Sequence, residues 1–197
     1  MQIAFDFLEA PPARPRRSER LFFALMPPVG IAAAIGRLRD GVISQHRLRG
    51  TRVENERLHV SLHHVGDYVR LREMFVYPAI RAGNTVSMRA FDVTFGCIHS
   101  FDPPPSRRGR ATRWPLVLLA EGDGLRELHQ FLGGAMQRQD LGAGQHFSPH
   151  MTLLYSTKPV PTQQITPFGF TAREFVLIHS ERSLTRYNVI GRWPLRA

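Results

Sequence analysis

Two short stretches of this 197-residue chain carry the residue types that acid–base chemistry needs. Each stretch, HVSL or HMTL, places a histidine two positions before a hydroxyl side chain: His59 precedes Ser61, and His150 precedes Thr152. Side chains alternate between the two faces of a β-strand, so each histidine would share a face with its hydroxyl while the apolar neighbours face the other way. We therefore expect two half-buried strands, each presenting one imidazole and one hydroxyl on the same side.

The repetition of the pattern indicates one site built from both strands. Histidine has an ordinary pKa near neutrality, so one imidazole can act as a general base and the other as a general acid. Hydroxyl groups can hydrogen-bond the non-bridging oxygens of a phosphate held between the imidazoles. A single histidine on a strand is more often structural than catalytic, but the paired pattern favours phosphodiester chemistry.

The flanking segments extend this pattern over most of the chain. The segment RLFFALMPP begins at Arg20, VGD follows the HVSL stretch, FSP precedes the HMTL stretch, and YNVI lies shortly before WPL, which ends at Leu195. With these motifs in this order, the chain resembles the two-histidine phosphoesterase superfamily. Within it, the chain resembles the bacterial and archaeal RNA 2′,3′-cyclic phosphodiesterases, historically called 2′-5′ RNA ligases.

The resemblance implies a fold and an activity. It implies an α+β, bilobal, pseudo-symmetric fold in which two mainly antiparallel sheets line a central groove and the helices lie outside. His59 and His150 would be catalytic, and Ser61 and Thr152 would hold the phosphate. Such an enzyme opens the 2′,3′-cyclic phosphate at an RNA 3′ end without a metal ion or cofactor and leaves a 2′-phosphate. It can also join that end to a 5′-hydroxyl through a 2′-5′ linkage, without ATP.

The resemblance also favours a direction for the two proton transfers. His150 would be the base that activates water, and His59 would be the acid that protonates the departing 3′ oxygen. The pseudo-symmetry of the two stretches leaves the reverse assignment open. Two other functions stay open as well. One is a phosphodiesterase of a small cyclic nucleotide such as ADP-ribose 1″,2″-cyclic phosphate, and the other is a non-catalytic RNA-binding module.

A competing interpretation is a metal site at His59, His63 and His64, with Asp67 nearby. Strand alternation would place His63 on the face of His59 and His64 on the opposite face, and no cysteine or further carboxylate completes the set. We therefore expect no metal. We expect His63 at the edge of the groove near substrate, and His64 as a hydrogen-bonded imidazole in the core.

One position departs from the family pattern. Many relatives carry an arginine two residues after the leucine of the second stretch, where this chain has Tyr155. The missing charge could come from Arg57, beside the first stretch, or from a basic loop near the middle of the chain. The loop arginines are Arg107, Arg108, Arg110 and Arg113. Together with them, the candidate substrate contacts are His63, His146, Phe22, Phe147 and Tyr155.

Composition limits the class of protein. The chain carries 26 Lys and Arg against 16 Asp and Glu, and only Lys158 is a lysine. Codon bias would explain the preference for arginine but not the net charge of +10, which favours RNA as a partner. Cys97 is the single cysteine, which excludes an intramolecular disulfide and a cysteine zinc site. No stretch approaches the roughly 20 apolar residues of a membrane span, and we expect a cytoplasmic monomer.

Periodicity predicts the elements that must position the two stretches. Residues 1–19 are expected to form a disordered basic tail, and residues 20–197 a single two-lobed domain. The predicted strands are 20–26, 58–65, 86–98 (as one or two strands), 114–120, 145–155, 175–179 and 187–193. The predicted helices are 29–46, 71–80 and 124–139, with a loop at 101–113. Pro78 is expected to kink or end the second helix.

Overall fold

The computed structural model of the chain describes residues 18–103, 112–181 and 185–196. Its helices are α1 (Val29–His46), the 3-10 turn η1 (Asn55–Arg57), α2 (Glu73–Asn84) and α3 (Asp123–Gln137). Its strands are β1 (Glu19–Leu25), β2 (Gly50–Arg52), β3 (Val60–Tyr68), β4 (Phe91–Ser100), β5 (Trp114–Glu121), β6 (His150–Ser156), β7 (Gln163–Ala172), β8 (Glu174–Glu181) and β9 (Arg186–Pro194). The expected tail lies outside the described residues as far as residue 17.

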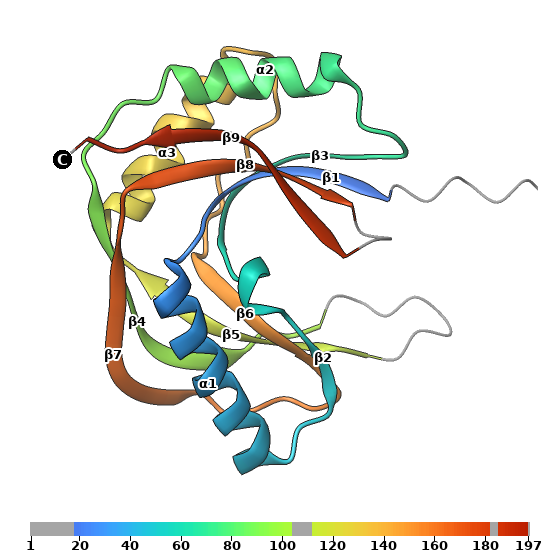
Figure 1. Cartoon of the computed structure of the whole chain (residues 1–197), viewed down its shortest axis with the longest axis vertical. Helices are drawn as coiled ribbons and strands as arrows, with labels where there is room; N and C mark the ends of the chain where they lie inside the picture. The colour runs from blue at the N-terminus through green and yellow to red at the C-terminus, as the bar shows by residue number, and fades with distance from the viewer. Residues whose placement is uncertain (1–17, 104–111, 182–184, 197) are drawn as a thin grey trace, which may run out of the picture.

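The strands form one antiparallel sheet made of two halves (Figure 1). The strand order is β7-β4-β5-β6-β3-β1-β8-β9, with β2 paired to β6 at the side. The halves join where β3 pairs with β6 through Val60 and Met151. The two expected sheets are therefore the halves of one continuous sheet, and the expected α+β architecture is confirmed.

The join brings the two sequence stretches together. Val60 directly follows His59, and Met151 directly follows His150, so the only register pair between β3 and β6 among the described residues lies next to both histidines. The main chain before β3 adds a second link, because the Val53 amide donates to the Leu153 carbonyl of β6 at 3.0 Å.

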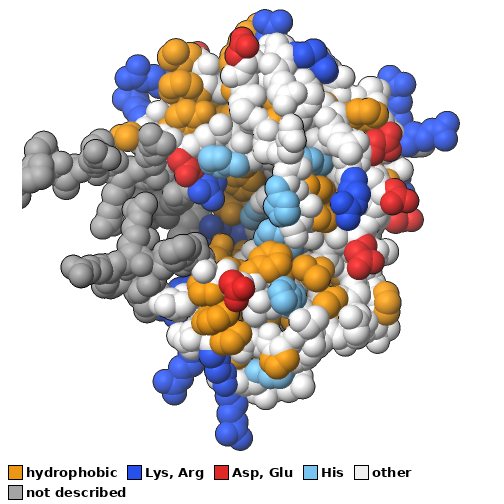
Figure 2. Space-filling view, turned by 180° about the vertical axis from the view of Figure 1, so that it is seen from behind, with side chains coloured by type: hydrophobic (Ala, Val, Ile, Leu, Met, Phe, Trp, Pro, Cys, Tyr) orange, Lys and Arg blue, Asp and Glu red, His pale blue; other side chains and the backbone are white. Residues whose placement is uncertain are grey.

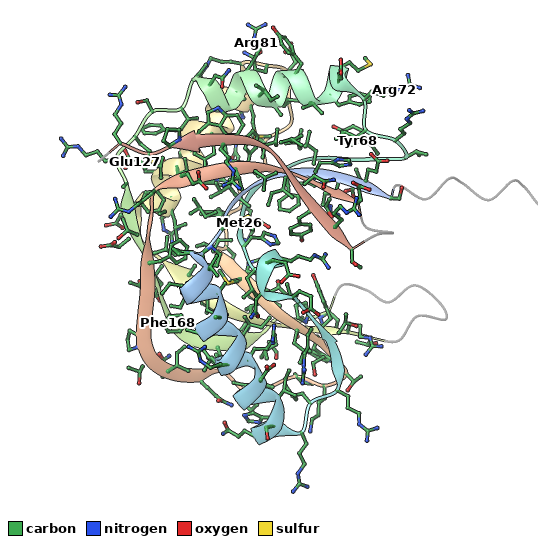
Figure 3. The ribbon with its side chains drawn as sticks, viewed as in Figure 1. Met26, Tyr68, Arg72, Arg81, Glu127 and Phe168 are labelled. Atoms are coloured by element: carbon green, nitrogen blue, oxygen red, sulfur yellow. The ribbon has the colours of Figure 1, made fainter. Side chains whose placement is uncertain are left out.

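Three helices cover the outside of the sheet. Helix α1 starts at the expected residue, and its first turn closes when the Ala32 amide donates to the Pro28 carbonyl at 2.8 Å. Phe168 of β7 faces α1 and lines a shallow apolar groove with Leu38 (Figure 3). Helix α3 packs on β3 and β4, and α2 packs on α3 and β9.

Two outcomes were expected at Pro78, a kink or an end of the helix, and the end is wrong, because α2 continues to Asn84. Tertiary contacts explain why the helix continues. The Trp193 indole of β9 donates to the Asn84 side chain at 2.7 Å, and its ring lies so close to Gly83 that a Cβ there would clash. Packing against β9 therefore supports the last turn of the helix although the proline removes one backbone hydrogen bond.

Strand β1 is buried on both of its faces. Leu21, Phe23 and Leu25 belong to the main core, which the helices cover. Phe22 and Ala24 belong to a smaller apolar cluster on the other face, against which Met26 packs. Figure 3 places Met26 near the junction of the two halves. Within the described residues, no helix is long and apolar enough to cross a membrane.

Candidate active site

A cavity of about 410 Å³ lies where the two halves join, and it holds both histidines of the sequence pattern. Its lining residues are Arg20, Phe22, Val53, Arg57, His59, Ser61, His64, His150, Thr152, Tyr155, Ser180 and Tyr187. Figure 2 shows histidine side chains gathered near the middle of one face of the molecule, with hydrophobic and basic side chains beside them. The structure thus brings together the four residues expected to do the chemistry.

Both imidazoles are oriented in the same way by the main chain. His59 Nδ1 lies 2.8 Å from the carbonyl oxygen of Arg57, and His150 Nδ1 lies 2.7 Å from the carbonyl oxygen of Ser148. A carbonyl oxygen can only accept, so Nδ1 is the donor in each imidazole. Nε2 of each ring is then the atom available to accept or donate a proton in the cavity.

Contacts outside the cavity hold the two carbonyl groups in place. The Arg57 carbonyl lies at the end of η1, and the preceding residues are held from α1 by Arg39, which donates to the Val53 carbonyl at 2.6 Å. On the other side, the Ala120 amide of β5 donates to the Pro149 carbonyl at 3.0 Å, next to the Ser148 carbonyl. Each histidine therefore depends on a segment that precedes its strand.

The two imidazoles have different surroundings. The His59 ring lies 5.0 Å from the Phe22 ring and 5.5 Å from the Tyr187 ring, measured between centroids. The His150 ring makes a T-shaped contact with the Phe101 ring, with 4.8 Å between centroids. The pKa of His59 is lowered to about 4, mainly by burial and to a smaller extent by the nearby charges of His150 and Arg57, against the opposing effect of the Arg57 carbonyl. His59 is therefore neutral at pH 7 in the free protein.

The hydroxyl groups occupy the expected face. Ser61 is exposed and Thr152 is half-buried, and both line the cavity. Two hydroxyl donors and two imidazoles thus border the same cavity. Alternation at the start of β3 and of β6 explains this, because it places each hydroxyl on the same face as the histidine two residues before it.

A β-bulge in β3 reverses the faces beyond Ser61, so two expectations are wrong. Ser61 pairs with Ala24, but His63 pairs with Phe23, which leaves Leu62 as an extra residue in β3. His63 therefore points into the core, where it is 4% exposed and hydrogen-bonds the His129 carbonyl at 2.8 Å. It does not line the cavity.

His64 takes the place expected for His63. Its side chain is 53% exposed, lines the cavity and lies 3.2 Å from an oxygen of Asp67. Asp67 also accepts two hydrogen bonds from the Arg20 guanidinium, from Nε at 2.7 Å and from Nη2 at 3.0 Å. This ion pair and His64 form one polar wall of the cavity that sequence reasoning did not predict.

The remaining candidate contacts divide into three groups. Phe22 and Tyr155 line the cavity, and burial raises the pKa of Tyr155. Phe147 instead stacks on the His129 ring at 4.2 Å outside the cavity, while His146 and Arg113 are exposed and do not line it. Arg107, Arg108 and Arg110 lie outside the described residues.

Tyr187 and Ser180 are further cavity residues that were not expected from the sequence, as is Val53. Tyr187 packs edge-on against His59 and Phe22, and Ser180 from β8 is 4% exposed at the cavity wall. Tyr187 begins the YNVI stretch, but that stretch alone did not place it at the site, because β8 reaches β1, and β9 reaches β8, only through the order of strands in the sheet. Among residues 18–103, 112–181 and 185–196, no three His, Cys, Asp or Glu side chains come together closely enough to hold a metal ion.

Paired imidazoles on the two halves of one antiparallel sheet define the class of two-histidine phosphoesterases. A family model described as the 2′-5′ RNA ligase superfamily matches residues 27–183, and the chain belongs to this family. Comparison with curated protein sequences found no match.

Solved structures share the fold over nearly their whole length. Escherichia coli LigT in its apo form is 25% identical, with a TM-score of 0.67, and the match covers 91% of this chain and 98% of LigT. The protein TT0787 of Thermus thermophilus is 22% identical, with a TM-score of 0.68 and coverage of 90% and 98%. The MHV ns2 PDE domain is 16% identical, with a TM-score of 0.51 and coverage of 87% and 99%.

Proposed function

We propose that this phosphoesterase hydrolyses the 2′,3′-cyclic phosphate at the 3′ end of RNA and leaves a 2′-phosphate. The observation that carries the proposal is the matched orientation of His59 and His150 in one cavity. Each imidazole donates through Nδ1 to a carbonyl, which leaves Nε2 for proton transfer, and both imidazoles line the same cavity. Hydrolysis of a cyclic diester needs one group to accept a proton and another to supply one, and two such imidazoles meet that need without a metal ion.

The reaction can be written with these residues. His150 Nε2 takes a proton from water while the water oxygen attacks phosphorus. The bond between phosphorus and the 3′ oxygen breaks, and His59 Nε2 gives its proton to that oxygen. The phosphate stays on the 2′ oxygen, and Ser61 and Thr152 donate hydrogen bonds to its non-bridging oxygens.

The surroundings of the imidazoles support this direction, which the resemblance also implies. Phe22 and Tyr187 pack against His59, so water reaches phosphorus more easily from the side of His150. Because His59 is neutral in the free protein, its acid role requires that the bound phosphate anion favour a proton on it. A low pKa then makes protonated His59 a strong proton donor. Replacing water by a 5′-hydroxyl in the same steps would join two RNA ends through a 2′-5′ linkage.

Hydrolysis of a small cyclic nucleotide is the second candidate. A cavity of about 410 Å³ suits one terminal nucleotide, which a small substrate and an RNA end both offer. Escherichia coli LigT, 26% identical to this chain, has been solved in complex with 3′-AMP, which supports a nucleotide ligand in this fold. The net charge of +10 favours RNA.

The test compares three substrates in the presence of EDTA. The purified protein is incubated with an oligonucleotide ending in a 2′,3′-cyclic phosphate, with a 2′,3′-cyclic mononucleotide and with ADP-ribose 1″,2″-cyclic phosphate. We expect the largest kcat/KM for the oligonucleotide and a product whose phosphorus NMR signal identifies a 2′-phosphate. A 3′-phosphate product, or a clear preference for the ADP-ribose substrate, would contradict the proposal.

A further inference from the structure

We propose that the guanidinium of Arg57 is the cation that binds the substrate phosphate in this cavity. This inference rests on the proposed function only in taking a phosphate as the ligand. The sequence offered two sources for this positive charge, Arg57 and the basic loop that contains Arg113. The geometry around Arg57 favours Arg57.

Arg57 reaches the cavity from the turn that orients His59. It is the last residue of η1, and its side chain lines the cavity together with His59. Its Cζ atom lies 4.6 Å from the centre of the Tyr187 ring. That ring also packs against His59, so the guanidinium and the His59 imidazole share one aromatic neighbour. The charge of Arg57 is therefore held close to an imidazole that acts on phosphorus.

The stacked guanidinium has donors left for a ligand. Nε of Arg57 is buried, and no residue in the described part of the chain accepts a hydrogen bond from it. A buried donor without an acceptor destabilises the free protein, so this side chain has an unmet demand for an acceptor. Stacking occupies the flat face of a guanidinium and leaves its edge free, and that edge matches two oxygens of a phosphate.

The other arginine in the cavity is already neutralised. Arg20 donates twice to Asp67, so a carboxylate occupies the Nε–Nη2 edge of this guanidinium and offsets its charge. Arg113, the basic-loop residue that the structure describes, is exposed and does not line the cavity. Arg57 is therefore the cavity arginine best placed to bind the phosphate.

The main chain and the side chain of Arg57 have separate roles, which makes the inference testable. The carbonyl oxygen orients His59 and is kept in any substitution. The charge lowers the pKa of His59, so its removal should raise that pKa. A residue with a merely structural role would not move the titration of His59.

The test measures binding of inorganic phosphate by calorimetry, without any turnover. We compare the parent protein with Arg57→Ala, Arg57→Lys and Arg126→Ala; Arg126 is exposed on α3 and serves as the control. We expect Arg57→Ala to bind phosphate about 10- to 100-fold more weakly, Arg57→Lys to recover part of the loss, and Arg126→Ala to bind as the parent does. If Arg57→Ala does not fold, Arg57→Gln replaces it.

A second readout follows the His59 ring proton by NMR as pH changes. The midpoint should move to higher pH in Arg57→Ala and stay near the parent value in Arg57→Lys. Unchanged phosphate affinity in Arg57→Ala would overturn the inference. Loss of phosphate binding in a protein that hydrolyses none of the three cyclic substrates would instead contradict the proposed function and leave the Arg57 site intact.

Discussion

At the scale of single residues, the site depends on the Nδ1 hydrogen bonds that the two histidines share. Each imidazole is fixed by a carbonyl two residues earlier in the chain, so ring orientation is built into the local backbone. The types and spacing of His59, Ser61, His150 and Thr152 were sufficient to predict that they meet. The polar wall of Arg20, His64 and Asp67 was not predictable, because it depends on a bulge and on sheet pairing.

The first prediction separates phosphate positioning from proton transfer. Ser61→Ala and Thr152→Ala each remove one hydrogen bond to a charged phosphate, which should cost about 1.5 to 3 kcal/mol in the free energy of the transition state. Steady-state kinetics on the cyclic-phosphate oligonucleotide would measure this loss. Losses as large as those of the histidine variants would mean that the hydroxyls do more than position the phosphate.

The second prediction tests which imidazole is the acid. A substrate with a much better leaving group than a ribose oxygen no longer needs to be protonated as it departs. Such a substrate should restore much of the activity of His59→Ala and little of the activity of His150→Ala. Restoration of His150→Ala alone would reverse the two roles and keep the two-histidine mechanism.

At the scale of elements, periodicity predicted the regular parts of the fold well. Helix α1 spans the predicted residues 29–46, because its apolar side chains recur at helical spacing. Strand β7 was missed, since Pro167 and Gly169 interrupt its pattern. Proline is tolerated there because β7 lies at one end of the strand order and forms an edge.

The bulge in β3 shows what alternation alone misses. One extra residue, Leu62, exchanges the faces of His63 and His64. No residue type near Leu62 marks the insertion, because apolar residues and histidines occur in this strand both before and after it. The physical cause is the pairing with β1, which leaves Leu62 unpaired and turns His63 toward α3.

The third prediction concerns the stack that this bulge creates. His63 lies on the His129 ring at 3.9 Å, and Phe147 lies on the other side of His129. The pKa of His129 is lowered to about 4, mainly by burial and to a smaller extent by the charge of His63. As pH falls, His129 of the unfolded chain therefore binds a proton near pH 6.5, whereas His129 of the folded protein binds it only near pH 4. Stability should fall as pH falls through this window.

Urea unfolding at pH 7.5 and pH 4.5 would measure the effect of the stack. His59 contributes to the same window, so the informative variant is His129→Phe, which keeps an aromatic ring in the stack and removes the titration. We expect the loss of stability between the two pH values to be smaller by about 1 to 3 kcal/mol in His129→Phe. His146→Phe, at an exposed position, should behave as the parent protein does. An unchanged pH dependence in His129→Phe would contradict this account of the stack.

At the scale of the whole molecule, the fold joins two half-sheets (Figure 1), and each supplies one imidazole to a shared cavity. The histidines are far apart in the sequence and meet because β3 and β6 pair beside them. The repeated order of strands and helices predicted this symmetry in outline. The continuity of the sheet was not predictable, because in the described part of the chain a single register pair joins β3 to β6.

The fourth prediction concerns how RNA outside the cavity is held. If Arg107, Arg108, Arg110 and Arg113 contact the RNA backbone, replacing all four with serine should raise the KM for an oligonucleotide and weaken its salt dependence. Hydrolysis of a cyclic mononucleotide should stay nearly unchanged. Equal losses on both substrates would place the loop at the scissile phosphate, and no loss on either would exclude it from RNA binding.

The most direct test of the central claim is a kinetic comparison of His59→Ala, His150→Ala and the double variant on the cyclic-phosphate oligonucleotide in EDTA. Because both imidazoles serve one reaction, each single variant should lose roughly 10²- to 10⁴-fold in turnover. The loss of turnover in the double variant should be far smaller than the product of the two single losses. The parent protein should show a bell-shaped dependence of kcat/KM on pH, and EDTA should change nothing. Near-parental activity in either single variant, with the variant shown to be folded, would contradict a mechanism that uses both histidines.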